Sequence, residues 1–176
     1  KIIVTGGLGY IGSHTAVELS DKFQVVLVDN LSNTTIHVLE GISSISNSKP
    51  IFEKLDLKNK SDIKSLFDKH SDAVGLIHFA AYKAIEESVG NPLKYYENNL
   101  SSLIYILQEI DKLNHSFSLI FSSSATVYGQ SINLPIKEEE SIKIAESPYG
   151  NTKKISEEIL QDYSKVNSNL NVISLR

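Results

Sequence analysis

The segment from Ile2 to Ser20 constrains the fold of this chain most, because it places a glycine-rich turn between a strand and a helix. The apolar run Ile2-Ile3-Val4 leads into Thr5-Gly6-Gly7-Leu8-Gly9-Tyr10-Ile11-Gly12, and an amphipathic stretch follows. The glycines fit two registers, G-x-G-x-x-G from Gly7 and G-x-x-G-x-x-G from Gly6. Such a turn lets the backbone approach a pyrophosphate at a helix N-terminus, which carries partial positive charge. We therefore expect a phosphate-binding βα turn, and a plain flexible turn is the alternative.

An acidic residue ends the second expected strand, which favours a dinucleotide as the ligand of the glycine-rich turn. The run from Phe23 to Asp29 is rich in β-branched residues and is typical of a strand. A carboxylate at its end would accept hydrogen bonds from a ribose diol and would repel a 2′-phosphate, so it favours NAD over NADP. The alternative is that Asp29 only caps the loop that follows it.

Strand-like and helix-like segments alternate along the rest of the chain. The expected strands cover residues 2–4, 23–29, 51–57, 74–80, 117–122 and 171–175. The expected helices cover residues 10–20, 61–70 and 92–113, with a short helix near 36–41. Ser61 would cap the helix 61–70, and a last helix would have Ser147 as its cap and Pro148 in its first turn. Continuous apolar strands that alternate with helices favour a parallel sheet covered on both faces. We expect an α/β fold, a doubly wound parallel sheet of Rossmann type, in one NAD-binding domain over residues 1–176.

Composition limits the classes of protein and partner. The 176 residues suffice for one domain, and 41% hydrophobic with 22% charged residues is ordinary for a soluble globular protein. No apolar run approaches the length of a bilayer-spanning helix, and the net charge of -4 argues against nucleic acid or a membrane as partner. The absence of cysteine excludes disulfides and thiolate metal sites and is compatible with a cytoplasmic location. The five histidines lack ligand-like spacing, so no metal site is expected.

Tyr149 and Lys153 lie four positions apart on the last expected helix, so they share one face. A phenol is a poor base at neutral pH, but a nearby ammonium favours its ionised form. Such a tyrosine can take the proton from a hydroxyl whose carbon loses a hydride to nicotinamide. The alternative is an exposed pair without a function.

Three serines end the fifth expected strand, within Phe121-Ser122-Ser123-Ser124-Ala125-Thr126-Val127-Tyr128-Gly129. Ligands bind at the carboxyl ends of parallel strands, where these hydroxyls would cluster. Ser124 is a candidate partner for a reacting hydroxyl. The alternative is that these serines bond only to the local backbone, as serines in turns commonly do.

Six motifs occur in order along the whole chain: TGGLGYIGSHT (5–15), DNLSN (29–33), HFAAYKAIEES (78–88), YYENN (95–99), FSSSATVYG (121–129) and SPYGNTK (147–153). By these motifs the chain resembles the extended short-chain dehydrogenase/reductase family, and within it the UDP-galactose 4-epimerases. The resemblance implies that Tyr149 is the catalytic base, that Lys153 holds the nicotinamide ribose and tunes Tyr149, and that Ser124 contacts the reacting sugar hydroxyl.

The resemblance also implies where NAD is bound. Tyr10 and Ile11 would lie at the pyrophosphate, residues 29–33 at the adenosine ribose, and Asp56 with Leu57 at the adenine. The full set of expected cofactor contacts is Gly6, Gly9, Tyr10, Ile11, Gly12, Asp29, Asn30, Leu31, Ser32, Asn33, Asp56, Leu57, Phe79, Ala80, Lys83, Asn98, Ser122, Tyr149 and Lys153.

The activity implied by the resemblance is the interconversion of UDP-galactose and UDP-glucose, as part of galactose metabolism. Hydride passes from sugar C4 to NAD and returns to the opposite face of the 4-keto sugar. The expected partners are a UDP-sugar and a second copy of the chain, paired through the helices 92–113 and 148–165. The family's polypeptide continues past the position of Arg176 into a UDP-sugar domain. We therefore expect that this chain ends before its substrate domain and has little or no epimerase activity alone.

The chain departs from the epimerase pattern around Lys83, where Ala81-Tyr82 replace the usual Gly-Leu and Glu86 replaces a glycine. The nearest rival activity is that of a sugar-nucleotide 4,6-dehydratase or a decarboxylase. Dehydratases of this family carry an Asp-Glu pair where this chain has Ala125-Thr126, which favours the epimerase. A non-catalytic NAD-binding regulator and a plain short-chain reductase of free alcohols are the further alternatives.

Overall fold

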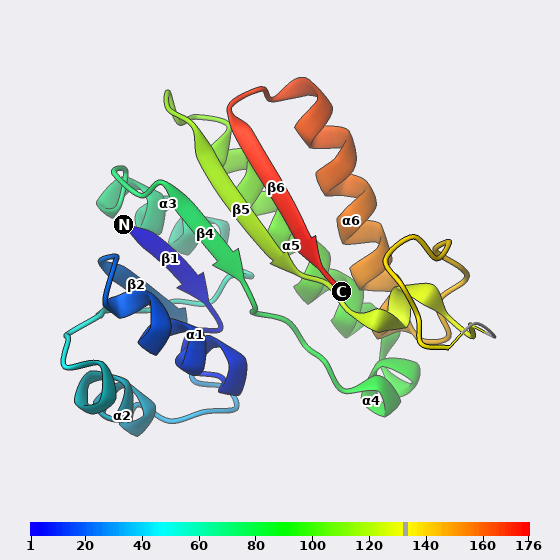
Figure 1. The fold of residues 1–176 in the computed structure, drawn as a ribbon, viewed down its shortest axis with the longest axis horizontal. Coiled ribbons are helices and arrows are strands. Elements are labelled where there is room, and N and C mark those ends of the chain that lie inside the picture. The colour runs from blue at the N-terminus through cyan, green and yellow to red at the C-terminus, as the bar shows by residue number, and fades with distance from the viewer. Residues whose placement is uncertain (132–133) are drawn as a thin grey trace.

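Six parallel strands form the centre of the molecule in a computed structural model that describes residues 1–131 and 134–176. The strands are β1 (Ile2–Thr5), β2 (Val25–Asp29), β3 (Ile51–Lys54), β4 (Gly75–His78), β5 (Phe117–Ser122) and β6 (Leu170–Leu175). Their order in the sheet is β3-β2-β1-β4-β5-β6. The chain moves outward in one direction from β1 and in the other from β4, so the carboxyl ends of these two strands flank the topological switch point. Figure 1 shows the strand arrowheads directed toward one common edge.

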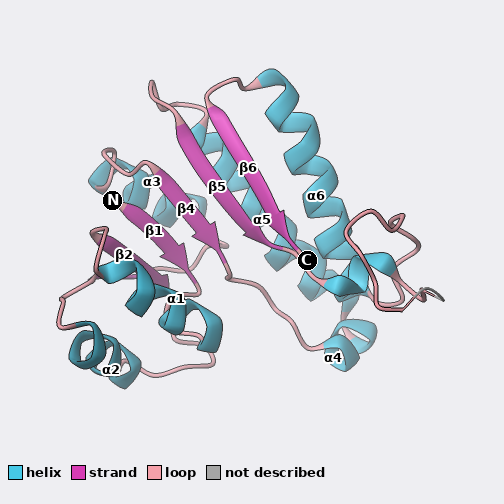
Figure 2. Ribbon diagram, viewed as in Figure 1, coloured by secondary structure: helices cyan, strands magenta, loops and turns pink. Residues whose placement is uncertain are grey.

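Helices cover both faces of this sheet. They are α1 (Tyr10–Ser20), α2 (His37–Ser46), α3 (Lys60–Lys69), α4 (Ile85–Gly90), α5 (Pro92–Ile110) and α6 (Pro148–Val166), with a short 3₁₀ helix η1 (Ala125–Tyr128). In Figures 1 and 2 the helices α1 and α2 lie on the viewer's side, whereas α3 and α5 lie behind the strands. Among the described residues, no helix combines the length and the apolar character that crossing a membrane would require.

Two hydrophobic clusters explain why the strands are apolar on both faces. Along β1, Ile3 points into one cluster and Val4 into the other, because neighbouring side chains alternate across a strand. The larger cluster packs α3, α5 and α6 on one face through Leu66, Leu103 and Leu160. The smaller cluster packs α1 and α2 on the opposite face. The prediction of a doubly wound parallel sheet is confirmed.

Most predicted elements are present, and three strands are shorter than predicted. The second strand begins at Val25, the third ends at Lys54, and the fourth covers only Gly75–His78. Ser147 caps α6 by accepting a hydrogen bond from Gly150 N, as predicted. The prediction that Ser61 caps the third helix is wrong, because α3 already begins at Lys60 with Asn59 in the capping position.

Candidate functional site

The glycine-rich turn between β1 and α1 is tightly folded against the end of β4. Gly6 has a φ of 65°, which is a left-handed conformation that favours glycine. A Cβ at Gly6 would lie 2.9 Å from Ala80 N, and one at Gly12 would lie 2.2 Å from Gly6 O. Both positions therefore exclude any side chain, which explains the two outer glycines of the G-x-x-G-x-x-G register.

The N-terminus of α1 faces the same edge of the sheet. Among the described residues, no side chain caps this helix, and its first turn contains no acidic residue. The first N–H groups of a helix lack intrahelical partners and attract anions. Tyr10 and Ile11 begin the helix with exposed side chains, at 83% and 58% of their full area. This end of α1 is thus suited chemically to a pyrophosphate.

Asp29 lies buried at the end of β2 and connects the glycine-rich turn to the next loop. Its Oδ2 accepts a hydrogen bond from Leu8 N at 3.1 Å, and its Oδ1 accepts one from Leu31 N at 2.9 Å. The structure therefore contains the loop cap considered as the alternative role for this residue. Each carboxylate oxygen keeps a second lone pair, so the cap leaves acceptor capacity for a ribose hydroxyl.

The residues expected around adenosine lie on two neighbouring loops. The Asn30 amide donates to Asp56 Oδ2 at 3.4 Å, and Asn30 Oδ1 accepts from Ser32 N at 3.0 Å. Leu57, the residue after Asp56, is buried. The loops after β2 and β3 are thus joined by a direct hydrogen bond.

A buried histidine joins the ends of β1 and β4 at the switch point. Thr5 Oγ1 lies 2.8 Å from His78 Nδ1 and also accepts the N–H of Ala80 at 3.4 Å. Burial, together with the charge of Lys153, lowers the pKa of His78 to about 3. The imidazole is therefore neutral at physiological pH. Phe79 and Ala80 follow on the same strand end, against Gly6.

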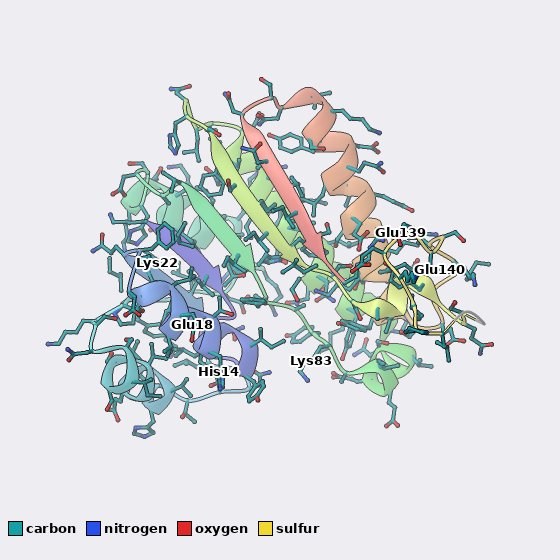
Figure 3. All side chains as sticks on the ribbon, in the orientation of Figure 1. His14, Glu18, Lys22, Lys83, Glu139 and Glu140 are labelled. Carbon is teal, nitrogen blue, oxygen red and sulfur yellow. The ribbon has the colours of Figure 1, made fainter. Side chains whose placement is uncertain are left out.

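The linker from β4 to α4 carries Lys83 and is held in place by its neighbour Tyr82. The side chain of buried Asn99 accepts from Tyr82 N at 2.9 Å and donates to Tyr82 O at 3.1 Å. The Tyr82 ring lies 4.7 Å from the Lys94 ammonium. In Figure 3, Lys83 projects from this linker into the space between α1 and α4. The larger residue at position 82 thus packs against α5 and leaves Lys83 exposed.

Tyr149 and Lys153 lie in the first turns of α6, beside the end of β5. Lys153 is 4% exposed, and its Nζ donates to Ser122 O at 2.7 Å. The same ammonium lies 4.8 Å from the centre of the Phe121 ring and 6.0 Å from that of Tyr149. Burial lowers the pKa of Lys153 to about 8. The sequence-predicted pair is therefore brought together, with the ammonium anchored on the backbone of β5.

Ser124 caps η1 immediately after β5. Its Oγ accepts hydrogen bonds from Thr126 N at 3.3 Å and from Thr126 Oγ1 at 2.9 Å. The predicted alternative of local backbone bonding is therefore present. A hydroxyl has two lone pairs and one proton. Because both of these bonds use the lone pairs, the proton of Ser124 remains available for donation to a ligand.

Three residues that the sequence patterns do not single out shape this edge of the sheet. The expected cofactor contact Asn98 donates to one of them, Asn99, at 2.9 Å, and Asn99 reaches both Tyr82 and Thr152. The other two, Glu157 and Arg176, form a bidentate ion pair next to β5. Asn99 lies inside the YYENN motif, which was the available signal; the ion pair joins distant positions that carry no local motif. No group of three or more His, Asp or Glu side chains suited to a metal occurs among the described residues.

Comparisons with known proteins agree with this geometry. A family model described as GDP-mannose 4,6-dehydratase matches residues 3–176. The chain is 40% identical to the UDP-glucose 4-epimerase of Neisseria meningitidis serogroup C over 178 aligned residues, which cover 100% of this chain and 52% of the relative. It is 42% identical to UDP-glucose 4-epimerase uge1 of Schizosaccharomyces pombe, covering 99% of this chain and 50% of the relative.

A solved structure is similarly close. The UDP-glucose 4-epimerase from Bifidobacterium longum, in complex with NAD⁺ and UDP, superposes with a TM-score of 0.94 at 36% identity. The superposition covers 99% of this chain and 52% of that one. The chain thus spans about half the length of the relatives that it matches.

Proposed function

This chain belongs to the GDP-mannose 4,6-dehydratase family of extended short-chain dehydrogenases/reductases, and from that premise we propose that it is the NAD-binding part of an enzyme that interconverts UDP-galactose and UDP-glucose. The observation that carries the proposal is that Tyr149 and Lys153 open α6 with Lys153 bonded to Ser122 O at the end of β5, and that Ser124 caps η1 two residues further on. This strand end belongs to the same sheet edge as the glycine-rich turn. Similar proteins are named UDP-glucose 4-epimerase, and one of them was solved in complex with NAD⁺ and UDP.

The residues present fit a bound NAD. The uncapped start of α1 offers N–H groups to the pyrophosphate, and the excluded side chains at Gly6 and Gly12 keep that approach open. Asp29 would bind the adenosine ribose and disfavour a 2′-phosphate, with residues 30–33 around it and Asp56 and Leu57 toward the adenine. Phe79, Ala80, Lys83, Asn98 and Ser122 would complete the cofactor contacts on the side of β4 and β5.

The proposed chemistry uses three side chains of the chain itself. Bound NAD supplies the acceptor and the donor of the hydride at sugar C4. Tyr149 takes the proton from the C4 hydroxyl as the hydride leaves and returns it after the 4-keto sugar has turned over. Lys153, held by Ser122 O, stabilises the phenolate by its positive charge and contacts the nicotinamide ribose. Ser124, whose oxygen accepts the two bonds from Thr126, donates its O–H to the reacting oxygen.

One observation separates this activity from the 4,6-dehydratase activity after which the family model is named. Dehydration needs an acid and a base beside the sugar, since a proton and a hydroxide must both leave. Dehydratases of this family carry an Asp-Glu pair for that purpose, whereas here Ala125 and Thr126 begin η1. Thr126 uses its hydroxyl to bond Ser124. We therefore propose epimerisation rather than elimination.

The proposal extends to the setting of the enzyme. We propose a homodimer paired through α5 and α6, a cytoplasmic location and a role in galactose metabolism. The UDP-sugar would be held jointly with the part of the enzyme that corresponds to the remaining half of the relatives. For that reason the 176-residue chain alone should turn over little or no UDP-galactose.

The deciding experiment uses the intact protein encoded by the gene, with UDP-galactose and without added NAD. Formation of UDP-glucose is expected, and Tyr149→Phe should abolish most of it. Mass spectrometry should detect NAD released from the denatured protein. A 4-keto-6-deoxy product would replace the proposal by the dehydratase, and bound NAD without any turnover would favour a regulator.

A further inference from the structure

A polar cluster outside the proposed catalytic residues connects α6, which carries Tyr149 and Lys153, to the ends of β5 and β6. Its centre is Glu157 on α6, which is one helical turn beyond Lys153 and is 8% exposed. Arg176 at the end of β6 donates to both Glu157 oxygens, from Nε at 3.1 Å and from Nη2 at 2.7 Å. The buried Ser123 hydroxyl also donates to Glu157. Glu157 therefore joins the end of β5 and the end of β6 to α6.

The second branch of this cluster reaches η1. Arg176 Nη1 lies 3.0 Å from the hydroxyl of Tyr128, and the guanidinium lies 5.2 Å from the centre of the Tyr128 ring. The bonds to Glu157 and Tyr128 raise the pKa of Arg176, so the side chain is charged at every accessible pH. Tyr128 is buried and is the last residue of η1, whose capping residue is Ser124. Arg176 thus holds the far end of the short helix that Ser124 begins.

The position of η1 decides where the Ser124 proton points. Both lone pairs of Ser124 Oγ are taken by Thr126, within η1 itself. If η1 tilts or shifts, the Ser124 O–H turns with it. A four-residue 3₁₀ helix is weakly stabilised by its own hydrogen bonds, so an outside contact has to fix its place. Gly150 of α6 lies close to Thr126 in η1, and Arg176, which Glu157 holds on α6, bonds the Tyr128 hydroxyl at the far end of η1.

We propose that Arg176 and Glu157 are positioning residues, which hold η1 against α6 so that Ser124 and Tyr149 face the same substrate hydroxyl. This inference rests on the proposed function, because it assigns a purpose to Ser124 in that reaction. Arg176 and Glu157 do not touch the reacting atoms in this scheme. Their effect passes through Tyr128 and Ser123, which are the two links from the ion pair to the segment around Ser124.

Two substitutions remove these two contacts and leave the ion pair between Arg176 and Glu157 in place. Tyr128→Phe removes the hydroxyl that Arg176 contacts, and Ser123→Ala removes the second donor to Glu157. Tyr163→Phe is the matched control, because its hydroxyl bonds Asp111 and Asn167 at the other end of α6. A misplacement of about 1 Å can cost about a hundredfold in rate. Tyr128→Phe and Ser123→Ala should therefore each lower kcat by about tenfold or more. KM and the retained NAD should stay within about twofold of the wild type.

Hydrogen exchange on the intact protein supplies a readout that does not depend on turnover. Residues 123–129 should exchange faster in Tyr128→Phe and in Ser123→Ala, and at the wild-type rate in Tyr163→Phe. Arg176→Lys keeps the charge but loses the bidentate geometry, so it should lower kcat and speed exchange as Tyr128→Phe and Ser123→Ala do. Unchanged kcat and unchanged exchange in these variants would overturn the inference. An inactive wild-type protein would instead refute the proposed function, and the exchange rates would still decide whether the cluster holds η1.

Discussion

Lys153 donates its hydrogen bond to the carbonyl oxygen of Ser122, at 2.7 Å, rather than to the side chain of Tyr149. The ammonium is thereby held at the end of β5, 4.8 Å from the centre of the Phe121 ring and almost fully buried. A cation in this place costs stability, since burial disfavours the charged form. A binding or catalytic role would explain why the chain keeps a lysine here.

The stability of the protein should therefore rise with pH in the alkaline range because of Lys153. Its folded pKa is about 8, compared with an ordinary value of 10.5. Between these values the unfolded chain binds more protons than the folded one, so the free energy of unfolding increases with pH. The gain is on the order of 3 kcal/mol. Urea unfolding at about pH 7 and pH 10 should show this gain in the wild type and not in Lys153→Met. The neighbouring Lys154→Met should behave as the wild type, and equal slopes in all three would contradict the prediction.

His78 should make the protein sensitive to acid. Burial lowers its pKa to about 3 from 6.5, so below about pH 6.5 the unfolded chain takes up a proton that the folded chain rejects. Stability is then lost as the pH falls through this window. His78→Gln should flatten the decrease in unfolding free energy between about pH 7 and pH 5. His14→Gln serves as the control, since His14 lies on the exposed side of α1 (Figure 3). An unchanged pH dependence in His78→Gln would show that other groups cause the acid sensitivity.

Some parts of the site could be predicted from the sequence, and others could not. The glycine-rich turn, Asp29 and the Tyr149–Lys153 pair were predictable, because each lies in a short motif with a fixed relation to a strand or helix. The short helices α4 and η1 were missed, since their four to six residues show too little periodicity. The ion pair of Glu157 with Arg176 was missed because it forms only when α6 packs beside the end of β6, and no local motif marks that packing.

The packing of Tyr82 could not be predicted from the sequence either, and it leads to a prediction about Lys94. Lys94 contacts the Tyr82 ring and pairs with Glu87, and the bond to Lys94 lowers the pKa of that carboxyl. Lys94→Met should lower the stability of the protein slightly and should speed hydrogen exchange in residues 79–84. Lys60→Met is the control, because Lys60 lies over the Tyr105 ring at a longer distance of 5.7 Å. Equal exchange in the two variants would show that Lys94 does not hold the linker that carries Lys83.

The glycine-rich turn should not tolerate even one methyl group at Gly12. The added Cβ would lie 2.2 Å from Gly6 O, which is backbone and cannot move aside without breaking the turn. Gly12→Ala should lower the unfolding free energy by about 3 kcal/mol and the affinity for NAD by more than about tenfold. Gly41→Ala on α2 is the matched control, since no atom lies within 4 Å of the position that its Cβ would take. This control should raise stability by about 0.5 kcal/mol. Normal NAD affinity in Gly12→Ala would mean that the cofactor does not depend on this turn.

Asp29 combines a loop cap with a proposed ribose contact, and Asp29→Asn separates the two. An amide offers one oxygen, so either Leu8 N or Leu31 N loses its acceptor, at a cost of about 1–3 kcal/mol in stability. Without the negative charge, a 2′-phosphate is no longer repelled. Calorimetric titration of the NAD-free protein should therefore show weaker NAD binding and a ratio of NAD to NADP affinity that falls at least about tenfold. Asp21→Asn, at the exposed end of α1, should leave both affinities unchanged. Lower stability with an unchanged affinity ratio would assign Asp29 to the loop cap alone.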